Sequence, residues 1–289
     1  MKIIIASSER NRIEEKVAAY SLLKCGHTED EINIIDGQTG LIYDVFRKHE
    51  PRHTDISNLG SSTSFTMARL YMPMYFEDDE IVIVDSDIIA YHHMSSIFED
   101  NQGPGIYVRK AYHPNEWATS VLGWKINDEI RQKFSHYRKD VESEKYSLRD
   151  KIYLRKNFVN AIGFEVHRID KEWNNFDIIN NRTKLVHFTN LATQPWRSER
   201  HPFEDDWFEM AREAKASGLL TDEDIKLQSK FSDVLISGKP LLRLDFCQLL
   251  NGNPKPKSVM KKLSSHLLLF YLNLKFHSPM KYIYSALVS

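Results

Sequence analysis

Two carboxylates follow the most continuous β-branched run of the sequence. Asp85 and Asp87 come directly after residues 81–84, Ile-Val-Ile-Val, which predict a strand that is buried on both faces. Carboxylates one residue apart repel each other unless they share a cation, and oxygen ligands suit a hard divalent ion such as Mg²⁺ or Mn²⁺. Such an ion commonly also binds phosphate oxygens of a substrate. The pair therefore predicts a metal site that accepts a nucleotide diphosphate.

The Asp-x-Asp triplet also occurs at Asp222 and Asp224, so the pattern alone is not specific. Thr221 precedes this second triplet and predicts the start of a helix there. Carboxylates in the first turn of a helix are stabilised by the helix dipole and need no metal. We therefore interpret the second triplet as structural.

The elements that must position Asp85 and Asp87 alternate along the chain. Residues 2–6 predict a buried strand, residues 13–23 a helix and residues 32–35 a second strand. Strands separated by helices at this spacing predict a mostly parallel sheet with helices on both faces. In such sheets ligands bind at the carboxyl ends of the strands, which is where the two aspartates stand.

Further elements are predicted downstream. The pattern predicts strands at 106–108, 120–125, 163–167 and 184–188, and helices at 62–75, which Pro73 bends or ends, at 126–134 and at 203–216. Gly218 suits the end of the last of these helices, and no internal repeat is present.

The ordered motifs resemble a known family. They are a helix with Arg69, Leu70 and Pro73, the run IVIVDSDIIA at 81–90, Ile97-Phe98, the segment LVHFTN at 185–190, and Gln194-Pro195-Trp196. In this order they resemble bacterial GT-A glycosyltransferases of the family 8 and glycogenin-like type, over about residues 1–202. The resemblance implies an α/β GT-A fold, Rossmann-like with a mostly parallel central sheet and flanking helices. We expect this catalytic domain to span 1–218, with a helical, basic and aromatic C-terminal appendage at 219–289.

The resemblance also implies the site residues. Asp85, Asp87 and His187 resemble the family's metal ligands, and an imidazole beside carboxylates favours Mn²⁺ over Mg²⁺. The residues that resemble donor-binding positions are Ser7, Arg69, Asp85, Ser86, Asp87, Ser120, Asn190 and Trp196. Asp150 resembles the catalytic position near the reacting sugar, and no nucleophile is assigned.

Two positions depart from the family pattern. Gln194 stands where the family often has a lysine near the diphosphate, and Arg197 or Lys184 could replace that missing cation. The family's frequent Asp-Gln pair corresponds here to Arg149-Asp150-Lys151. These departures keep open a catalytically inactive, glycosyltransferase-like module that binds a nucleotide or a glycan.

The activity that the resemblance implies is that of a retaining hexosyltransferase. It would move a hexose from a UDP-sugar to a hydroxyl of a glycan or lipid-linked acceptor, as in polysaccharide biosynthesis. A sugar-phosphate nucleotidyltransferase is less favoured, because residues 7–12 after the first strand contain no glycine. An NAD-dependent dehydrogenase is not favoured either, because no G-x-G-x-x-G follows a strand.

Composition limits the binding partners and the cellular compartment that we expect. The formal charge of 39 − 40 = −1 gives no field for a nucleic acid. Two cysteines, Cys25 and Cys247, exclude a disulfide framework and favour a reducing compartment, so we expect a cytoplasmic protein.

The last 44 residues contain lysines but no acidic residue. The lysines alternate with apolar and aromatic residues, which is typical of a segment that lies at a lipid interface. Two interpretations remain open: peripheral contact with the inner face of the membrane, or an ordinary helix packed on the body.

Overall fold

The computed structural model describes residues 1–36, 69–100, 103–199, 201–231, 235–236, 239–243 and 245–251. The first part of the helix predicted at 62–75 and the basic tail at 252–289 lie outside these residues. Residues 69–71 are helical, and the 3-10 turn η4 (Met72–Met74) follows them at Pro73.

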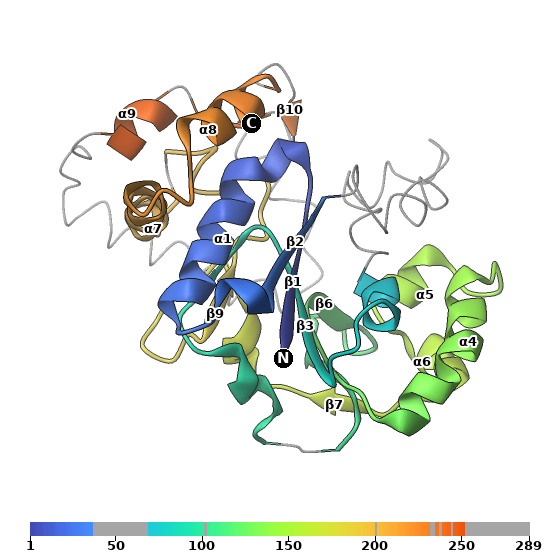
Figure 1. Cartoon of the computed structure of the whole chain (residues 1–289). Coiled ribbons are helices and arrows are strands. Elements are labelled where there is room, and N and C mark those ends of the chain that lie inside the picture. The colour runs from blue at the N-terminus through green and yellow to red at the C-terminus, as the bar shows by residue number, and fades with distance from the viewer. Residues whose placement is uncertain are drawn as a thin grey trace.

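A mixed, mostly parallel sheet forms the centre of the molecule (Figure 1). Its strands are β1 (Lys2–Ser7), β2 (Ile32–Asp36), β3 (Glu80–Asp85), β5 (Gly105–Lys110), β6 (Trp117–Lys125) and β7 (Val166–Arg168), in the order β2-β1-β3-β6-β5-β7. Only β6 runs against its neighbours β3 and β5. The carboxyl ends of β1, β3 and β5 therefore meet at one edge, and the predicted α/β class is confirmed.

Helices cover both faces of this sheet (Figure 1). On one side lie α1 (Arg12–Lys24), α7 (Glu204–Ala216), α8 (Asp222–Ser229) and α9 (Phe246–Asn251), and on the other α4 (Asp128–Glu142), α5 (Leu148–Ile152) and α6 (Lys156–Ile162). The short 3-10 turns are η1 (Glu9–Asn11), η2 (Glu29–Glu31), η5 (Met94–Phe98) and η6 (Lys171–Asn174).

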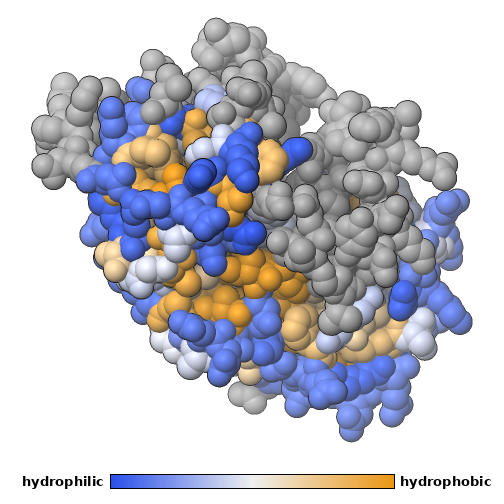
Figure 2. Space-filling model, turned by 45° about the horizontal axis from the view of Figure 1, so that its top comes forward, coloured by the Kyte–Doolittle hydropathy of each residue, from blue (hydrophilic) through white to orange (hydrophobic). Residues whose placement is uncertain are grey.

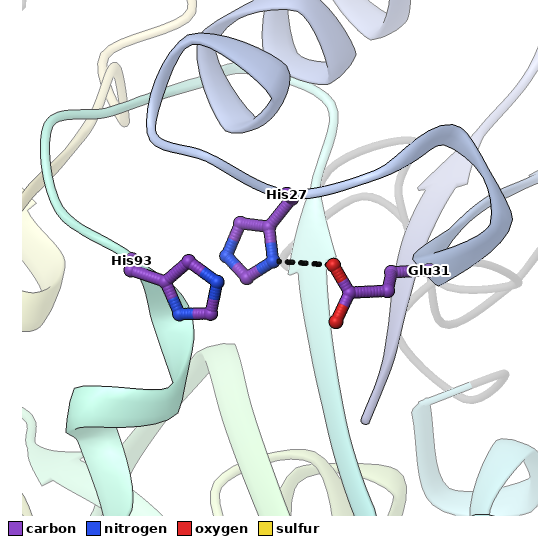
Figure 3. A group of neighbouring side chains, drawn as sticks. All are labelled: His27, Glu31 and His93. Carbon is purple, nitrogen blue, oxygen red and sulfur yellow. Dashed lines mark hydrogen bonds and ion pairs between the residues drawn. The ribbon is translucent and has the colours of Figure 1, made fainter.

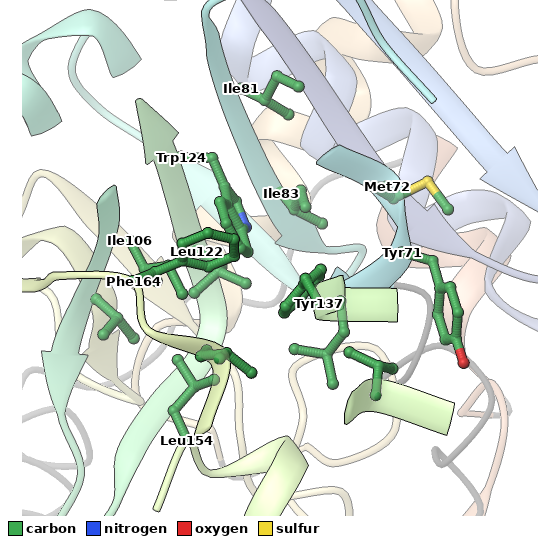
Figure 4. Packing of buried hydrophobic residues seen from close by; sticks show 14 of the residues in the cluster. Tyr71, Met72, Ile81, Ile83, Ile106, Leu122, Trp124, Tyr137, Leu154 and Phe164 are labelled. Carbon is green, nitrogen blue, oxygen red and sulfur yellow. The ribbon is translucent and has the colours of Figure 1, made fainter. Parts of the chain in front are cut away.

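The two-sided burial explains the β-branched run of β3. Ile81 and Ile83 pack with Trp124 and Tyr137 against α4 and its neighbours (Figure 4), whereas the alternate residues Val82 and Val84 join a second cluster with α1. All four side chains of the run are fully buried. Side chains of successive strand residues point to opposite faces of the sheet. A continuous apolar run is therefore needed only in a strand whose two faces are both covered.

A second, three-stranded sheet lies beside the carboxyl edge and carries part of the site. It consists of β4 (Ile88–Ala90), β9 (Leu185–His187) and β8 (Asn175–Phe176), in the order β4-β9-β8. The register sets His187 opposite Ile88 on one side and opposite Phe176 on the other. A further short pair is formed by β10 (Leu235–Ile236) and β11 (Lys239–Pro240).

Element boundaries differ from the predictions where capping decides them. The helix predicted at 126–134 begins after Asn127, whose side chain accepts from the Ile130 amide, and continues to Glu142. The strand predicted at 163–167 starts only at Val166, because Gly163 ends α6 with φ 65°. Thr221 and Asp224 form a capping box at the start of α8, so the structural interpretation of the second triplet is confirmed.

Residues 219–251, placed by the sequence in an appendage, share a core with the preceding helices where they are described. Leu220, Ile225 and Phe246 belong to one cluster with Trp207 of α7 and Ile13 of α1. The boundary at 218 stays a prediction.

One face of the molecule shows hydrophobic residues in a band across its middle, between hydrophilic margins (Figure 2). Within the described ranges, no helix has the length and apolar character needed to cross a membrane.

Candidate functional site

Asp85, Asp87 and His187 meet at the carboxyl edge of the central sheet. Asp85 is the last residue of β3, and the pairing of β4 with β9 brings His187 beside it. His187 Nε2 lies 3.0 Å from Asp87 Oδ1 and 3.7 Å from Asp85 Oδ2. One ligand atom from each residue lies within 4.8 Å of the others.

This donor set fits a divalent cation. Two carboxylates and one imidazole nitrogen face a common point, which is the arrangement that the sequence predicted for these three residues. The identity of the metal is not fixed by the donor set, because oxygen and imidazole ligands suit several divalent ions.

The charges of the three residues are strongly coupled. Burial raises the pKa of Asp85, and Asp87 raises it further, although Arg69 and His187 oppose the shift. Burial tends to lower the pKa of His187, but the charges of Asp87 and Asp85 outweigh burial and raise it. A proton on His187 thus occupies the position that a cation would take, and the two compete.

Arg69 is bound to the first carboxylate. Its Nη2 donates to Asp85 Oδ1, and its Nη1 donates to Thr119 Oγ1 at 3.2 Å. The Thr119 hydroxyl in turn donates to the Ile152 carbonyl at 2.7 Å. Arg69 is 6% exposed, and its Nε has no hydrogen-bond partner among the described residues. A predicted donor-binding residue therefore stands in direct contact with a predicted metal ligand.

Gln194 replaces the expected lysine with a neutral donor. Its Nε2 donates to Asp87 Oδ2 at 3.0 Å and to the Phe188 carbonyl at 2.8 Å. The amide thus orients the second carboxylate. The departure at this position therefore leaves the candidate metal-binding carboxylate with a hydrogen-bond donor.

Arg197 supplies a buried cation nearby. It is 5% exposed, and its Nε and Nη1 have no hydrogen-bond partner among the described residues. Burial lowers its pKa, while Glu14 and Asp87 stabilise its charge. Buried guanidinium N–H groups without partners are rare, since each costs desolvation free energy, so they mark a position for an anion.

Glu14 balances this arginine from α1. Burial raises the pKa of Glu14 to about 7, while Arg197 and the Gln228 amide lower it. Gln228 Nε2 donates to Glu14 Oε2 at 2.7 Å, and Gln228 Oε1 accepts from the Ile13 amide at 2.7 Å. The sequence analysis missed Glu14, although its spacing to the buried Ala18 and Ser21 places it on the apolar face of α1.

The other predicted donor-binding residues take structural positions around this centre. Ser7 ends β1 and is fully buried, and Ser86 is buried between the two aspartates. Ser120 accepts from Asn174 Nδ2 at 3.0 Å. The Asn190 carbonyl accepts from the Thr193 and Gln194 amides, and Trp196 is 1% exposed, packed between Phe188 and Trp207. Their donor-binding roles remain predictions.

Asp150 stands in the first turn of α5. Its Oδ2 accepts from the amide of Ser147 at 3.0 Å and from the hydroxyl of Ser147 at 2.6 Å. Its Oδ1 lies 3.6 Å from Arg155 Nη1. These contacts form a capping box, and they join Asp150 to none of the three predicted metal ligands.

A second group of residues that could bind a metal lies just past the C-terminal end of α1: His27, Glu31 and His93 (Figure 3). His27 Nε2 accepts from the Met94 amide at 2.9 Å, so the proton of a neutral ring is on Nδ1, which lies 3.2 Å from Glu31 Oε2. A cation on Nδ1 would move that proton to Nε2, against the Met94 N–H. The His93 ring stacks on the His27 ring, with 3.7 Å between the ring centroids. We therefore interpret the group as structural, because its hydrogen bonds require one tautomer of His27.

Comparisons with known proteins agree on the fold. No protein-family model and no curated protein matches the sequence. Among solved structures, the bifunctional glycosyltransferase WbbM matches with a TM-score of 0.55 at 12% identity, covering 80% of this chain and 51% of that one. The chain thus spans about half the length of WbbM.

Two further structures match at a similar level. The galactosyltransferase LgtC, in complex with donor and acceptor sugar analogues, gives a TM-score of 0.51 at 14% identity, covering 76% of this chain and 100% of that one. The glycosyltransferase GlyE of Streptococcus pneumoniae TIGR4 gives 0.50 at 17% identity, covering 83% and 64%. The predicted GT-A resemblance to family 8 is confirmed at the level of the fold.

Proposed function

We propose that this chain, which has the fold of GT-A glycosyltransferases, is a metal-dependent retaining hexosyltransferase. It would move a hexose from a UDP-sugar to a hydroxyl of a glycan or lipid-linked acceptor. The observation that carries the proposal is the convergence of Asp85, Asp87 and His187 at the carboxyl edge of the sheet. That edge is where open α/β sheets bind their ligands.

Asp85, Asp87 and His187 would hold Mn²⁺ (or Mg²⁺), which would stabilise the negative charge of the leaving diphosphate. The chain's own residues prepare this position. Arg69 fixes Asp85 and Gln194 fixes Asp87, so the carboxylates need little reorganisation when the donor binds. This rigidity supports a catalytic use over a purely structural one.

Arg197 would bind the diphosphate in place of the family's lysine. Its two unpartnered N–H groups and its electrostatic interaction with Asp87 support this role. A charge-assisted hydrogen bond from a buried guanidinium to phosphate is among the stronger contacts a protein can offer. Lys184 is the weaker candidate, because its ammonium lies over the Trp173 ring at 5.1 Å.

Retention of configuration requires that the acceptor attack from the face that the diphosphate leaves. A leaving phosphate oxygen would then take the acceptor's proton, and no protein acid would be needed. Asp150 keeps its proposed place near the reacting sugar. Because its carboxylate also caps α5, a substitution there would weaken that helix as well.

The proposed setting is the cytoplasm, with acceptors of a cell-surface polymer. The basic tail at 252–289 is proposed to touch the inner face of the membrane. Deletion of the tail should lower partition onto anionic vesicles, and unchanged partition would contradict the membrane contact.

The experiment that tests the function is release of UDP from a panel of UDP-hexoses with Mn²⁺, with Mg²⁺ and with a chelator. We expect release from at least one donor with metal and none with chelator. Thermal stabilisation by UDP plus Mn²⁺ without any release would instead favour the inactive binding module. No release and no stabilisation would contradict both.

A further inference from the structure

Tyr112 presents an exposed aromatic ring at the edge that carries the metal site. Tyr112 is 57% exposed. Among the described residues, it is the one large hydrophobic side chain that is exposed. Tyr112 follows β5, whose carboxyl end lies at the same edge as that of β3, because both run against β6. An amphipathic aromatic ring that is exposed at the edge of the candidate metal site can contact a ligand bound there.

A second ring connects Tyr112 to the metal ligands. The Phe176 ring lies 5.3 Å from the Tyr112 ring, at an angle of 57°, and 6.1 Å from the His187 ring, at 71°. Phe176 is paired with His187 in the small sheet, so the distance to the metal site is fixed by backbone hydrogen bonds. Phe176 therefore lies in ring contact with both Tyr112 and His187.

The support beneath these rings is rigid. The Arg109 guanidinium lies 4.0 Å from the centre of the Phe176 ring, and its Nη1 donates to the Asn174 carbonyl. Asn174 is fully buried, and its Nδ2 donates to the Ala118 carbonyl at 3.2 Å and to Ser120 Oγ. A surface held in this way loses little conformational entropy when a ligand binds.

Asp177 adds an oxygen acceptor next to the rings. It has φ 54°, a left-handed conformation that is costly for a residue with a side chain. Its Oδ2 accepts from the Thr189 hydroxyl, while its Oδ1 is buried, faces His201 Nε2 at 3.9 Å and has no hydrogen-bond partner in the described part of the chain. Its charge acts on both His187 and Tyr112.

We propose that Tyr112, Phe176 and Asp177 form the subsite for a hexopyranose ring of the acceptor. The C–H groups of one pyranose face would pack on the aromatic rings, whose faces carry negative partial charge. Asp177 Oδ2, which also accepts from Thr189, would accept from a sugar hydroxyl. This inference rests on the proposed function, because it takes the donor sugar to lie at the metal.

The strand order separates this subsite from the nucleotide. Ser7, the proposed nucleotide contact, ends β1, while Tyr112 follows β5, and β3 with the metal ligands lies between them in the order β2-β1-β3-β6-β5. A ring that stacks on Tyr112 is therefore on the far side of the cation from the nucleoside. That side is where an acceptor must stand to reach the transferred sugar.

The test compares Tyr112→Ala and Tyr112→Phe with the control His136→Ala, which removes an exposed ring from α4. Lactose, maltose and cellobiose serve as probes, first by saturation-transfer NMR with UDP and Mn²⁺ present, then as acceptors in the UDP-release assay. Hydrolysis of the donor without any sugar acceptor is measured in parallel.

We expect at least one disaccharide to bind the wild type with strongest saturation on the ring C–H protons. Tyr112→Ala should weaken that binding, and raise the acceptor KM, about tenfold, while Tyr112→Phe and the control stay within about twofold. Donor hydrolysis should be unchanged in the His136→Ala control, and the acceptor KM of each Tyr112 variant is read against that variant's own donor hydrolysis.

Two results would overturn the subsite: no disaccharide binding by the wild type, or equal binding by wild type and Tyr112→Ala. Either can occur while UDP release remains metal-dependent, in which case the proposed function stands. Disaccharide binding that depends on Tyr112, without UDP release from any donor, would contradict the enzyme and leave a carbohydrate-binding site.

Discussion

Gln194 Nε2 lies 3.0 Å from Asp87 Oδ2 and donates a hydrogen bond to it, although 107 positions separate the two residues. An amide at this place orients the carboxylate without neutralising it. A lysine ammonium in the same contact would compete with a cation for the carboxylate charge. The neutral donor therefore suits the proposal that Arg197 supplies the cation for the diphosphate.

Replacement of Gln194 by leucine should weaken metal binding. Asp87 would lose the donor that orients it, and loss of such an outer-shell partner costs about tenfold to a hundredfold in metal affinity. The Phe188 carbonyl would also lose its partner, at about 1–3 kcal/mol of unfolding free energy. Mn²⁺ titration and urea unfolding measure the two effects. Gln132→Leu, on the exposed face of α4, is the control, and equal Mn²⁺ affinity in both variants would contradict the role of Gln194.

Asp87→Asn should abolish tight metal binding, since the substitution removes a charged ligand. We expect Mn²⁺ affinity to fall about a hundredfold or more, with a similar loss of UDP release. The matched control is Asp222→Asn, in the other Asp-x-Asp triplet, where the side chain is exposed and lies 2.7 Å from Lys215. Turnover of Asp87→Asn within about threefold of wild type would refute the metal assignment.

Arg197→Ala should weaken binding of the diphosphate without weakening binding of the nucleoside. Affinity for UDP should fall about tenfold to a hundredfold, the range of one charge-assisted contact, while affinity for uridine stays unchanged. Calorimetry with both ligands gives the comparison, and Arg138→Ala on the surface of α4 is the control. A parallel loss for uridine would mean that Arg197 acts through the fold. The variant is best made together with Glu14→Gln, so that no buried carboxylate loses its counter-charge.

Glu14 should make stability depend on pH between about 4.5 and 7. Its pKa is raised by burial from 4.5 to about 7 in the folded chain, so the folded state keeps a proton that the unfolded state has released. The free energy of unfolding therefore falls as pH rises through this interval, by up to about 3 kcal/mol from this group. Above pH 7 the loss is complete.

The measurement is urea unfolding of wild type and Glu14→Gln at several values between pH 4.5 and 8. The glutamine keeps an acceptor for Gln228 Nε2 but cannot titrate. The difference in unfolding free energy between the two proteins should shift with pH in favour of the variant. A difference that is constant across the interval would show that Glu14 is ionised throughout.

The sequence predicted the parts of this protein that depend on local pattern. Four β-branched residues without alternation required a strand covered on both faces, and Val82 and Ile83 indeed pack into different clusters. Thr221 predicted a helix start that made the second Asp-x-Asp triplet structural, and the structure has a capping box there. The candidate metal ligands, including His187, were predicted from the order of motifs, and the structure brings them together.

Other features could not be read from the sequence, because they depend on which strands become neighbours. The register of β8 and β9 sets Phe176 against His187 and leaves Asp177 in a strained conformation, and no local pattern indicates either. Asp150 was predicted to be catalytic from its place in a motif. In the structure, its carboxylate forms a capping box with Ser147 at the start of α5.

The sequence by itself thus determined many of the strands and helices, and which of their ends carry charged or metal-ligating residue types. Tertiary structure alone decided how those charges are balanced. Gln194 donates to Asp87, and the charge of Arg197 acts on Glu14, each across more than a hundred positions, because the fold buries Glu14, Gln194 and Arg197 beside the partly exposed Asp87. Buried polar groups take whatever partner the fold brings within reach, and the cost of leaving them without one fixes those pairs.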